Sequence, residues 1–227
     1  MTYTPIPKGT DSWDVPVNAA FVDQDTRITA NTASITSNSA NIATLQTQSA
    51  QVRNASWLPS DYGLISWSMD PSQGANSQVL TSGTLVMIGF KVRSAASLTN
   101  VNIVVSTAGA ALTVGQNLVG VYDSAGTLVA QSASQEANWT STGHKQIAMI
   151  GGPYPLAAGT YYVAILSNGG TPISIPRETS LSSNIVNLNL SVANARSANL
   201  AGQTTLPASI TPGSRAFDMN SYWAAIS

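Results

Sequence analysis

Apolar residues recur at a spacing of seven in the first quarter of the chain. The residues on this spacing are Phe21, Ile28, Ile35, Ile42 and the polar Ser49. A spacing of seven is typical of an α-helix that supercoils around other helices. With the isoleucines at heptad position a, position d holds Gln24, Asn31, Asn38, Leu45 and Val52. We predict a coiled-coil stalk over residues 21–54, with a core of Phe21, Ile28, Ile35, Ile42, Leu45 and Val52.

The remainder of the stalk segment is uncharged and rich in serine, threonine and asparagine. No charged residue lies between Arg27 and Arg53, and Ser, Thr and Asn are poor helix formers. Such a helix takes its stability from partners that bury its isoleucine layers, so the segment predicts an oligomer. Because isoleucine at a with leucine at d also suits two strands, this pattern alone leaves dimer and trimer open.

Beyond Trp57 the pattern changes to short segments in which apolar and polar residues alternate, separated by Gly, Asn, Ser and Pro. We predict strands over residues 84–92, 101–106, 117–122, 128–133, 146–150, 160–166 and 185–192. Strands spaced in this way are typical of an antiparallel sandwich or jelly roll. The predicted fold is therefore mainly β, an N-terminal α-helical coiled coil followed by a jelly-roll-like β-sandwich head over residues 57–227.

Two local patterns refine the expected head. The sequence from Tyr122 to Leu128 contains Gly126 between two apolar runs, which predicts a hairpin. Within residues 160–166, strand alternation places Tyr161, Val163 and Ile165 on one face and Tyr162, Ala164 and Leu166 on the other.

Residues 1–20 contain prolines at positions 5, 7 and 16 and a glycine at position 9. This density of proline excludes a regular helix or a central strand, so we expect an extended segment. Its single Trp13 suits a peptide that docks on another protein, and a frayed terminus is the alternative.

Charged residues are scarce throughout. They make up 8% of the chain, with a net charge of −1, against about 25% in an average domain. This balance provides no basic surface for nucleic acid or anionic lipid. The 43% of hydrophobic residues excludes a wholly disordered chain, while every apolar run falls far short of the ~20 residues that span a bilayer. We expect neither nucleic-acid binding nor membrane insertion.

The sequence also lacks catalytic patterns. It has no Cys, two Glu and a single His, His144, for which we expect no role. We see no metal-ligand spacing, phosphate-binding glycine loop or nucleophile elbow. A wall-polysaccharide depolymerase would need two carboxylates held ~5–10 Å apart, and the acidic residues of the head are scattered singly. We therefore predict a protein that is not an enzyme, with no metal site and no required cofactor.

Binding is the function that the polar composition favours. Ser, Thr, Asn and Gln together make up 81 of the 227 residues. A glycan site combines an aromatic face with a few placed polar groups. Trp139, in a polar run without strand alternation, and Tyr154, between two prolines, are the candidate glycan-binding residues. Burial of Trp139 at one end of the sandwich is the alternative.

Two short segments resemble the stalk repeat of trimeric autotransporter adhesins and phage fibres. They are Ile-Thr-Ala-Asn-Thr at 28–32 and Ile-Thr-Ser-Asn-Ser at 35–39. The resemblance implies a homotrimer in which Asn31 and Asn38 point to the three-fold axis and hold chloride or a similar anion. The alternative is a dimer in which these asparagines fix the helix register.

Other segments resemble phage tail proteins. Residues 119–128 and 156–164 are similar to the β-sandwich heads of phage tail appendages, and residues 9–18 are similar to the head-proximal end of phage minor tail proteins. These resemblances imply a virion component, made in the host cytoplasm and attached to another virion protein through residues 1–20. The implied function is that of a tail fibre or receptor-binding protein whose head recognises host cell-surface carbohydrate. A head fibre or capsid decoration protein is the alternative. A bacterial adhesin is also compatible with the stalk, but the N-terminus lacks the apolar core of a signal peptide.

Overall fold

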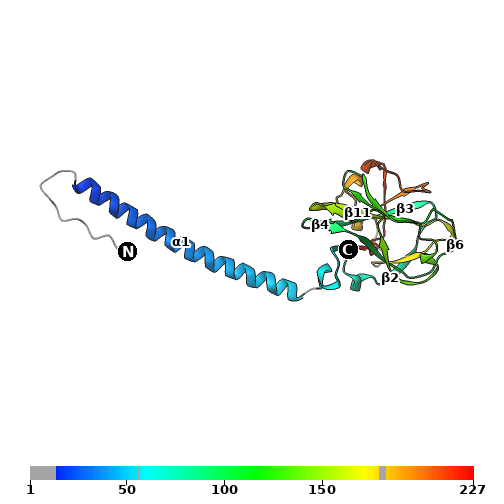
Figure 1. The fold of residues 1–227 in the computed structure, drawn as a ribbon, viewed down its shortest axis with the longest axis horizontal. Helices are drawn as coiled ribbons and strands as arrows, with labels where there is room; N and C mark the ends of the chain where they lie inside the picture. Colours follow the sequence, from blue (N-terminus) through cyan, green and yellow to red (C-terminus); the bar gives the residue numbers. More distant parts are fainter. Residues whose placement is uncertain (1–13, 56, 179–182) are drawn as a thin grey trace. The chain divides into compact units, whose positions relative to one another are not determined.

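A computed structural model describes residues 14–55, 57–178 and 183–227 of the chain (Figure 1). Within the first of these ranges, side chains are described for residues 17–49. The chain divides into two compact units, residues 1–57 and residues 58–227.

The first unit contains one long helix, α1 (Asp14–Ala55). It confirms the predicted helix but begins earlier, so the prediction of an extended segment is wrong for residues 14–20. Pro16 is the third residue of α1, and the first four N–H groups of a helix have no partner within it. A proline there removes no helical hydrogen bond. Residues 1–13 of the predicted attachment segment lie outside the described residues.

Side-chain hydroxyls along α1 bond back to the helix itself. Each donates to the backbone carbonyl four residues earlier, at 2.8–3.0 Å. The residues are Thr26, Thr29, Thr32, Ser34, Thr36, Ser39, Thr44 and Thr47. This bonding satisfies the hydroxyls without a neighbour, although it slightly weakens a helix.

The second unit is mainly β. Its longer strands are β3 (Thr84–Val92), β5 (Asn100–Val105), β7 (Leu118–Asp123), β9 (Gly143–Ala148), β11 (Gly159–Leu166) and β14 (Ser197–Ala201). The shorter strands are β1 (Ser66–Trp67), β2 (Asn76–Val79), β4 (Ala96–Leu98), β6 (Ala110–Leu112), β8 (Leu128–Gln131), β10 (Tyr154–Leu156), β12 (Gly169–Thr171), β13 (Ser174–Arg177), β15 (Ala216–Phe217) and β16 (Ala225–Ile226). Short helices connect them: η1 (Pro59–Tyr62), η2 (Pro71–Gln73), η3 (Asn138–Thr140), α2 (Ser183–Val186), η4 (Val192–Asn194) and η5 (Pro212–Ser214).

Two antiparallel sheets organise this unit. A four-stranded sheet has the order β1-β16-β5-β9, and a six-stranded sheet has the order β15-β14-β3-β11-β7-β8. The pairs β10-β4, β12-β6 and β13-β2 form three small sheets beside them. The last strand, β16, thus lies inside the four-stranded sheet, between β1 and β5.

The main core lies between the two larger sheets. It combines Val101 and Ile103 of β5 with Val86 of β3 and Val163 and Ile165 of β11. This shared core is what two packed antiparallel sheets require. The six predicted strands that contribute to the larger sheets are confirmed within a few residues.

The other face of the six-stranded sheet is also buried. Tyr162, Ala164 and Leu166 of β11 pack there against Leu206 and Ile210, which come from the chain after β14. The predicted alternation along residues 160–166 is therefore confirmed, because the opposite set faces the main core. A covered sheet of this kind explains why β3 and β11 read as nearly continuous apolar runs.

The predicted hairpin at residues 122–128 is confirmed, since β7 pairs with β8. Gly126 closes it with a φ of 88°. A Cβ at this position would lie 1.9 Å from the backbone oxygen of Ile210. The turn therefore requires glycine for both its conformation and its packing.

The predicted strand at residues 185–192 is wrong. This segment contains the end of α2, a turn and the start of η4. Asn187 is buried, and its amide group makes three hydrogen bonds, two with the Ser197 backbone and one to the Asp218 carbonyl. These bonds hold the Asn187 side chain against the backbone of residues 197 and 218. The segment therefore does not form a strand, although its sequence alternates like one.

Candidate functional site

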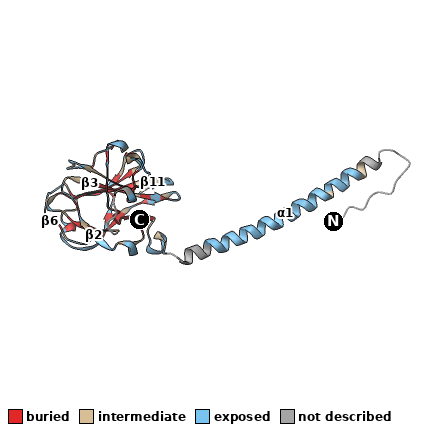
Figure 2. Ribbon diagram, turned by 180° about the vertical axis from the view of Figure 1, so that it is seen from behind, coloured by how far each residue is buried: buried red, intermediate tan, exposed pale blue. Residues whose placement is uncertain are grey.

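The predicted core residues of the stalk form an exposed apolar stripe along α1. Ile28, Ile35 and Ile42 expose 58%, 66% and 55% of their surfaces, and Phe21 and Leu45 are exposed as well. Figure 2 shows the described part of α1 without a buried residue, whereas buried residues gather in the β region. The side chain of Val52 lies outside the described residues. The isoleucines of the stripe recur every seven residues, about two helical turns apart, and are exposed to solvent.

Asn31 and Asn38 lie three residues after Ile28 and Ile35, respectively, and are exposed. Residues three apart on a helix share a face. The helix therefore places both amides beside the apolar stripe, as the heptad reading requires.

The prediction that Trp139 is an exposed sugar platform is wrong. Trp139 belongs to η3, and its side chain is 0% exposed within the main core. Its backbone nitrogen donates to the Gln135 carbonyl at 2.9 Å, and its carbonyl accepts from Gly109 at 2.9 Å. Packing against the two sheets therefore takes the whole ring away from any ligand.

Tyr154, the second candidate, is half-buried at the start of β10 and packs against the main core. Its hydroxyl donates to the Ile150 carbonyl. A Cβ at Gly152 would lie 3.4 Å from the tyrosine ring, so the ring lies over the glycine turn before it. The ring is a structural part of this turn with one exposed side.

The described residues also form a recess of ≈ 240 Å³ at the β15 edge of the six-stranded sheet, which we call the edge recess. Its polar lining residues are Gln78, Thr81, Thr84, Asn199, Asp218 and Asn220. Its apolar and aromatic lining residues are Val79, Val86, Phe217, Met219 and Tyr222. Sheet register explains part of this grouping, because Asn199 of β14 is the cross-strand partner of Val86 on β3. No sequence pattern indicates this site, since its residues come from three separated stretches, 78–86, 199 and 217–222.

Asp218 is the central polar group of the edge recess. Its side chain is 7% exposed. One carboxylate oxygen accepts from the backbone and side-chain nitrogens of Asn220 at 2.8 and 2.9 Å. The other oxygen accepts from the Asn199 side chain at 3.4 Å. These bonds fix the orientation of the carboxylate.

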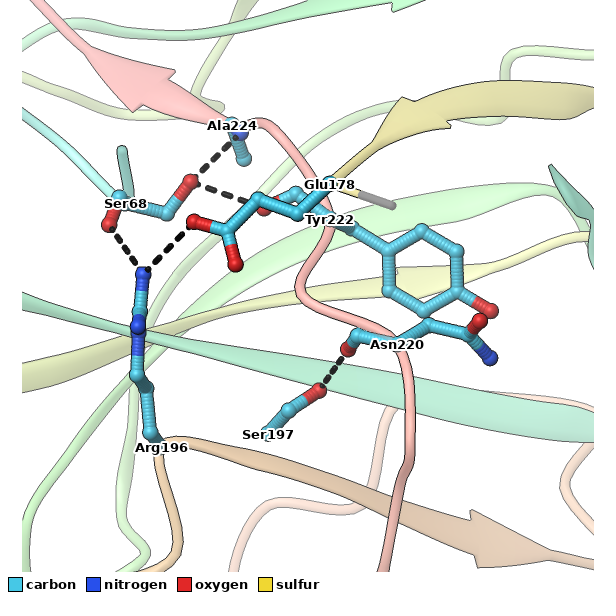
Figure 3. A network of polar contacts seen from close by, with 7 residues as sticks. All are labelled: Ser68, Glu178, Arg196, Ser197, Asn220, Tyr222 and Ala224. Atoms are coloured by element: carbon cyan, nitrogen blue, oxygen red, sulfur yellow. Dashed lines mark hydrogen bonds and ion pairs between the residues drawn. The ribbon is translucent and has the colours of Figure 1, made fainter. Parts of the chain in front are cut away.

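The segment that carries Asp218 and Asn220 is tied to several parts of the β region (Figure 3). Ser197 donates its hydroxyl to the Asn220 carbonyl. Ser68 donates to the Tyr222 carbonyl at 2.8 Å and accepts from the Ala224 nitrogen at 3.1 Å. Arg196 links Ser68 to Glu178, with 3.4 Å from its guanidinium to the Glu178 carboxylate. The recess wall is therefore held in place before any ligand arrives.

Tyr222 forms part of this wall, and its ionisation is suppressed. Burial raises the pKa of Tyr222 well above its ordinary value, and the Asp218 charge raises it further. Burial also raises the pKa of Tyr122, whose hydroxyl donates to the Pro207 carbonyl at 2.7 Å. The folded β region therefore holds both phenols in their neutral form.

We expect the free energy of unfolding to fall as the pH rises above ~10, where tyrosines of the unfolded chain ionise. Below that pH both states are neutral at these groups, so the contribution of Tyr122 and Tyr222 is fully present. Phenolate absorbance and urea unfolding at each pH measure the effect, and Tyr222→Phe should remove part of it. The expectation would be contradicted if Tyr122 and Tyr222 ionised at the same pH as the exposed tyrosines while the far-UV spectrum remained that of the folded protein.

Among the described residues, no group of three or more His, Cys, Asp or Glu side chains is placed to hold a metal ion. His144 lies in β9, exposed, with its Nε2 3.0 Å from the Asn102 side-chain oxygen. Within the described part of the chain, no helix combines the length and apolarity needed to cross a membrane.

Comparison with models of known protein families gave no match, and a search of curated proteins gave none either.

Proposed function

We propose that the chain is a subunit of a trimeric virion appendage, a tail fibre or receptor-binding protein. In this proposal α1 forms a three-stranded coiled-coil stalk, and the β region is a jelly-roll-like head that binds a host cell-surface glycan. The observation that carries the proposal is the exposed row of Ile28, Ile35, Ile42 and Leu45 at heptad positions.

The composition of α1 supports self-association. Most of its exposed positions hold Ser, Thr, Asn, Gln or Ala, and of these Ser, Thr and Asn are weak helix formers. Burying a side chain such as Ile35 in a helix interface contributes on the order of 1.5–3 kcal/mol. Three or four such layers in each helix offset the weak intrinsic propensity. A stalk of this sequence is therefore stable as an oligomer and marginal as a single helix.

Trimer rather than dimer rests on the resemblance of residues 28–39 to phage fibre stalks. In a trimer, Asn31 and Asn38 at position d point to the axis, where their amide nitrogens donate to chloride or a similar anion. Such a bound anion compensates amides that would otherwise be buried without partners. Attachment to another virion protein falls to the N-terminal segment, of which residues 1–13 lie outside the described residues.

Light scattering on the purified full chain tests the assembly. We expect three times the 23.5 kDa mass of one chain. A monomer would contradict the stalk, and a dimer would contradict the anion sites.

Cryo-electron microscopy of the intact particle tests the role of the protein. Density at the tail tip supports host recognition, whereas density on the capsid indicates a decoration protein. Purified wall polysaccharide should inhibit adsorption of the particle to host cells. Adsorption that the polysaccharide leaves unchanged would contradict glycan recognition.

We also expect the assembly to tolerate salt. No charged residue lies between Arg27 and Arg53, so the stalk core contains no ion pairs for salt to screen. The melting temperature of the helical signal should not fall between low and high NaCl concentrations. Circular dichroism at matched protein concentrations measures this temperature. A steep fall would indicate that charged contacts hold the helices together.

A further inference from the structure

We propose that the edge recess binds one neutral sugar unit of the host glycan. This inference rests on the proposed function and deepens it by naming a site and a ligand class. The recess replaces Trp139 as the candidate, because that ring is buried in the main core.

The chemistry of the lining matches sugar hydroxyls. Gln78, Asn199 and Asn220 carry amide groups, and Thr81 and Thr84 carry hydroxyls. Amides and hydroxyls both donate and accept hydrogen bonds. A sugar hydroxyl does the same, so each can meet a donor and an acceptor in this wall. A lining of this kind offers no cation to pair with a phosphate or carboxylate ligand.

Asp218 makes the recess favour a neutral sugar over an anionic one. It is the one charged residue among those that line the recess. A carboxylate offers about four acceptor positions, and Asn220 and Asn199 donate to three of them. The remaining position can accept a hydrogen bond from a sugar hydroxyl. Because Asp218 is buried and is the one charged residue of the lining, it would repel an anionic sugar placed in the recess.

The size and rim of the recess favour a single ring. Its volume of ≈ 240 Å³ lies below the roughly 300–1,000 Å³ of sites for drug-sized ligands. Val79 and Met219 are exposed at the recess, and Val86 is buried behind it. These side chains can contact the C–H groups of a sugar ring, while the rest of a glycan extends into solvent. The fixed recess wall lowers the entropy lost on binding.

Amide chemical shifts of the isotope-labelled full chain test the proposal. The probes are glucose, galactose, mannose, rhamnose, N-acetylglucosamine and N-acetylgalactosamine, with glucuronate as the anionic counterpart of glucose. We expect at least one neutral sugar to shift the backbone signals of Asn199, Asp218 and Asn220, and glucuronate to leave them unchanged. The proposal fails if no neutral sugar shifts these signals, or if glucuronate binds as tightly as the neutral sugars.

A matched pair of variants separates binding from folding. Thr84→Val keeps the shape of a residue lining the recess and removes its hydroxyl, whereas Thr171→Val makes the same change on β12, outside the lining. We expect Thr84→Val to weaken sugar binding about two- to tenfold, the usual effect of one hydrogen bond. Thr171→Val should bind as the unchanged chain does. Equal affinities for the two variants would overturn the site.

The two proposals fail separately. A chain that is monomeric yet shows the sugar-induced shifts keeps the site and loses the trimeric stalk. A chain that is trimeric and shows no shift with any neutral sugar keeps the stalk and loses the site.

Discussion

Ile35→Asp is expected to break the assembly into single chains. Ile35 is the most exposed isoleucine of the stripe, at 66%, and lies in the middle of the heptad row. In a trimer the substitution buries three carboxylates against one another, and each buried charge without a partner costs several kcal/mol. Light scattering should show the mass falling from three chains to one, and circular dichroism should show loss of helix.

Ala33→Asp is the matched control. It introduces the same charge on α1 two residues away, at heptad position f, which faces solvent in a coiled coil. Its mass and helical signal should stay those of the unchanged chain. If Ile35→Asp keeps the full mass as well, the stripe is not the interface.

Trp139→Ala is expected to destabilise the β region by about 3–5 kcal/mol, the usual loss for a large buried aromatic side chain. The ring is fully buried in the main core, so its removal leaves a cavity between the sheets. Urea unfolding followed by far-UV circular dichroism measures the change. The loss is a large fraction of the stability of a typical domain.

Two further variants bracket this result. Trp139→Phe keeps an aromatic ring and removes an indole nitrogen that has no hydrogen-bond partner, so it should lose less than the alanine variant. Val114→Ala, at a residue that is 80% exposed, should stay within about 0.5 kcal/mol. A Trp139→Ala variant as stable as Val114→Ala would contradict the burial of the ring.

The hydrophobic pattern predicted most of the large elements. Residues 84–92 and 160–166 form paired strands because both faces of their sheet are buried, which gives long apolar runs. The seven-residue spacing predicted the helix for a similar reason, since its apolar positions form one stripe. Patterns of this kind report which positions are apolar, and they succeed where the burial of those positions decides the structure.

The pattern failed where the contacts of single residues decide the structure. Residues 185–192 alternate like a strand, yet Asn187 bonds to Ser197 and Asp218 far along the chain. Trp139 lies in a polar run, yet its ring inserts between the sheets. In both cases a contact with residues elsewhere in the chain determines the local structure. The local alternation of apolar and polar residues contains no information about that contact.

The edge recess could not be predicted for the same reason. Gln78, Thr84, Asn199 and Asp218 come from separate segments, and only sheet register brings them together. Each of them alone reads as an ordinary polar surface residue. The sequence signal nearest to the site is the Asp-Met-Asn run at 218–220, which has no distinctive spacing.

The place of β16 has a consequence for biosynthesis. Ala225 and Ile226 are translated after the other strands that the structure describes, yet they pair with β1 on one side and β5 on the other. Ser227 also bonds through its backbone to Asn100. The four-stranded sheet therefore closes only after translation of these residues, whereas α1 is translated before the β region. In the proposed trimer, helices of nascent chains on one messenger RNA can meet before the four-stranded sheet of any chain has closed. A chain truncated before residue 225 can therefore add its helix to a trimer although it is unable to complete its own four-stranded sheet.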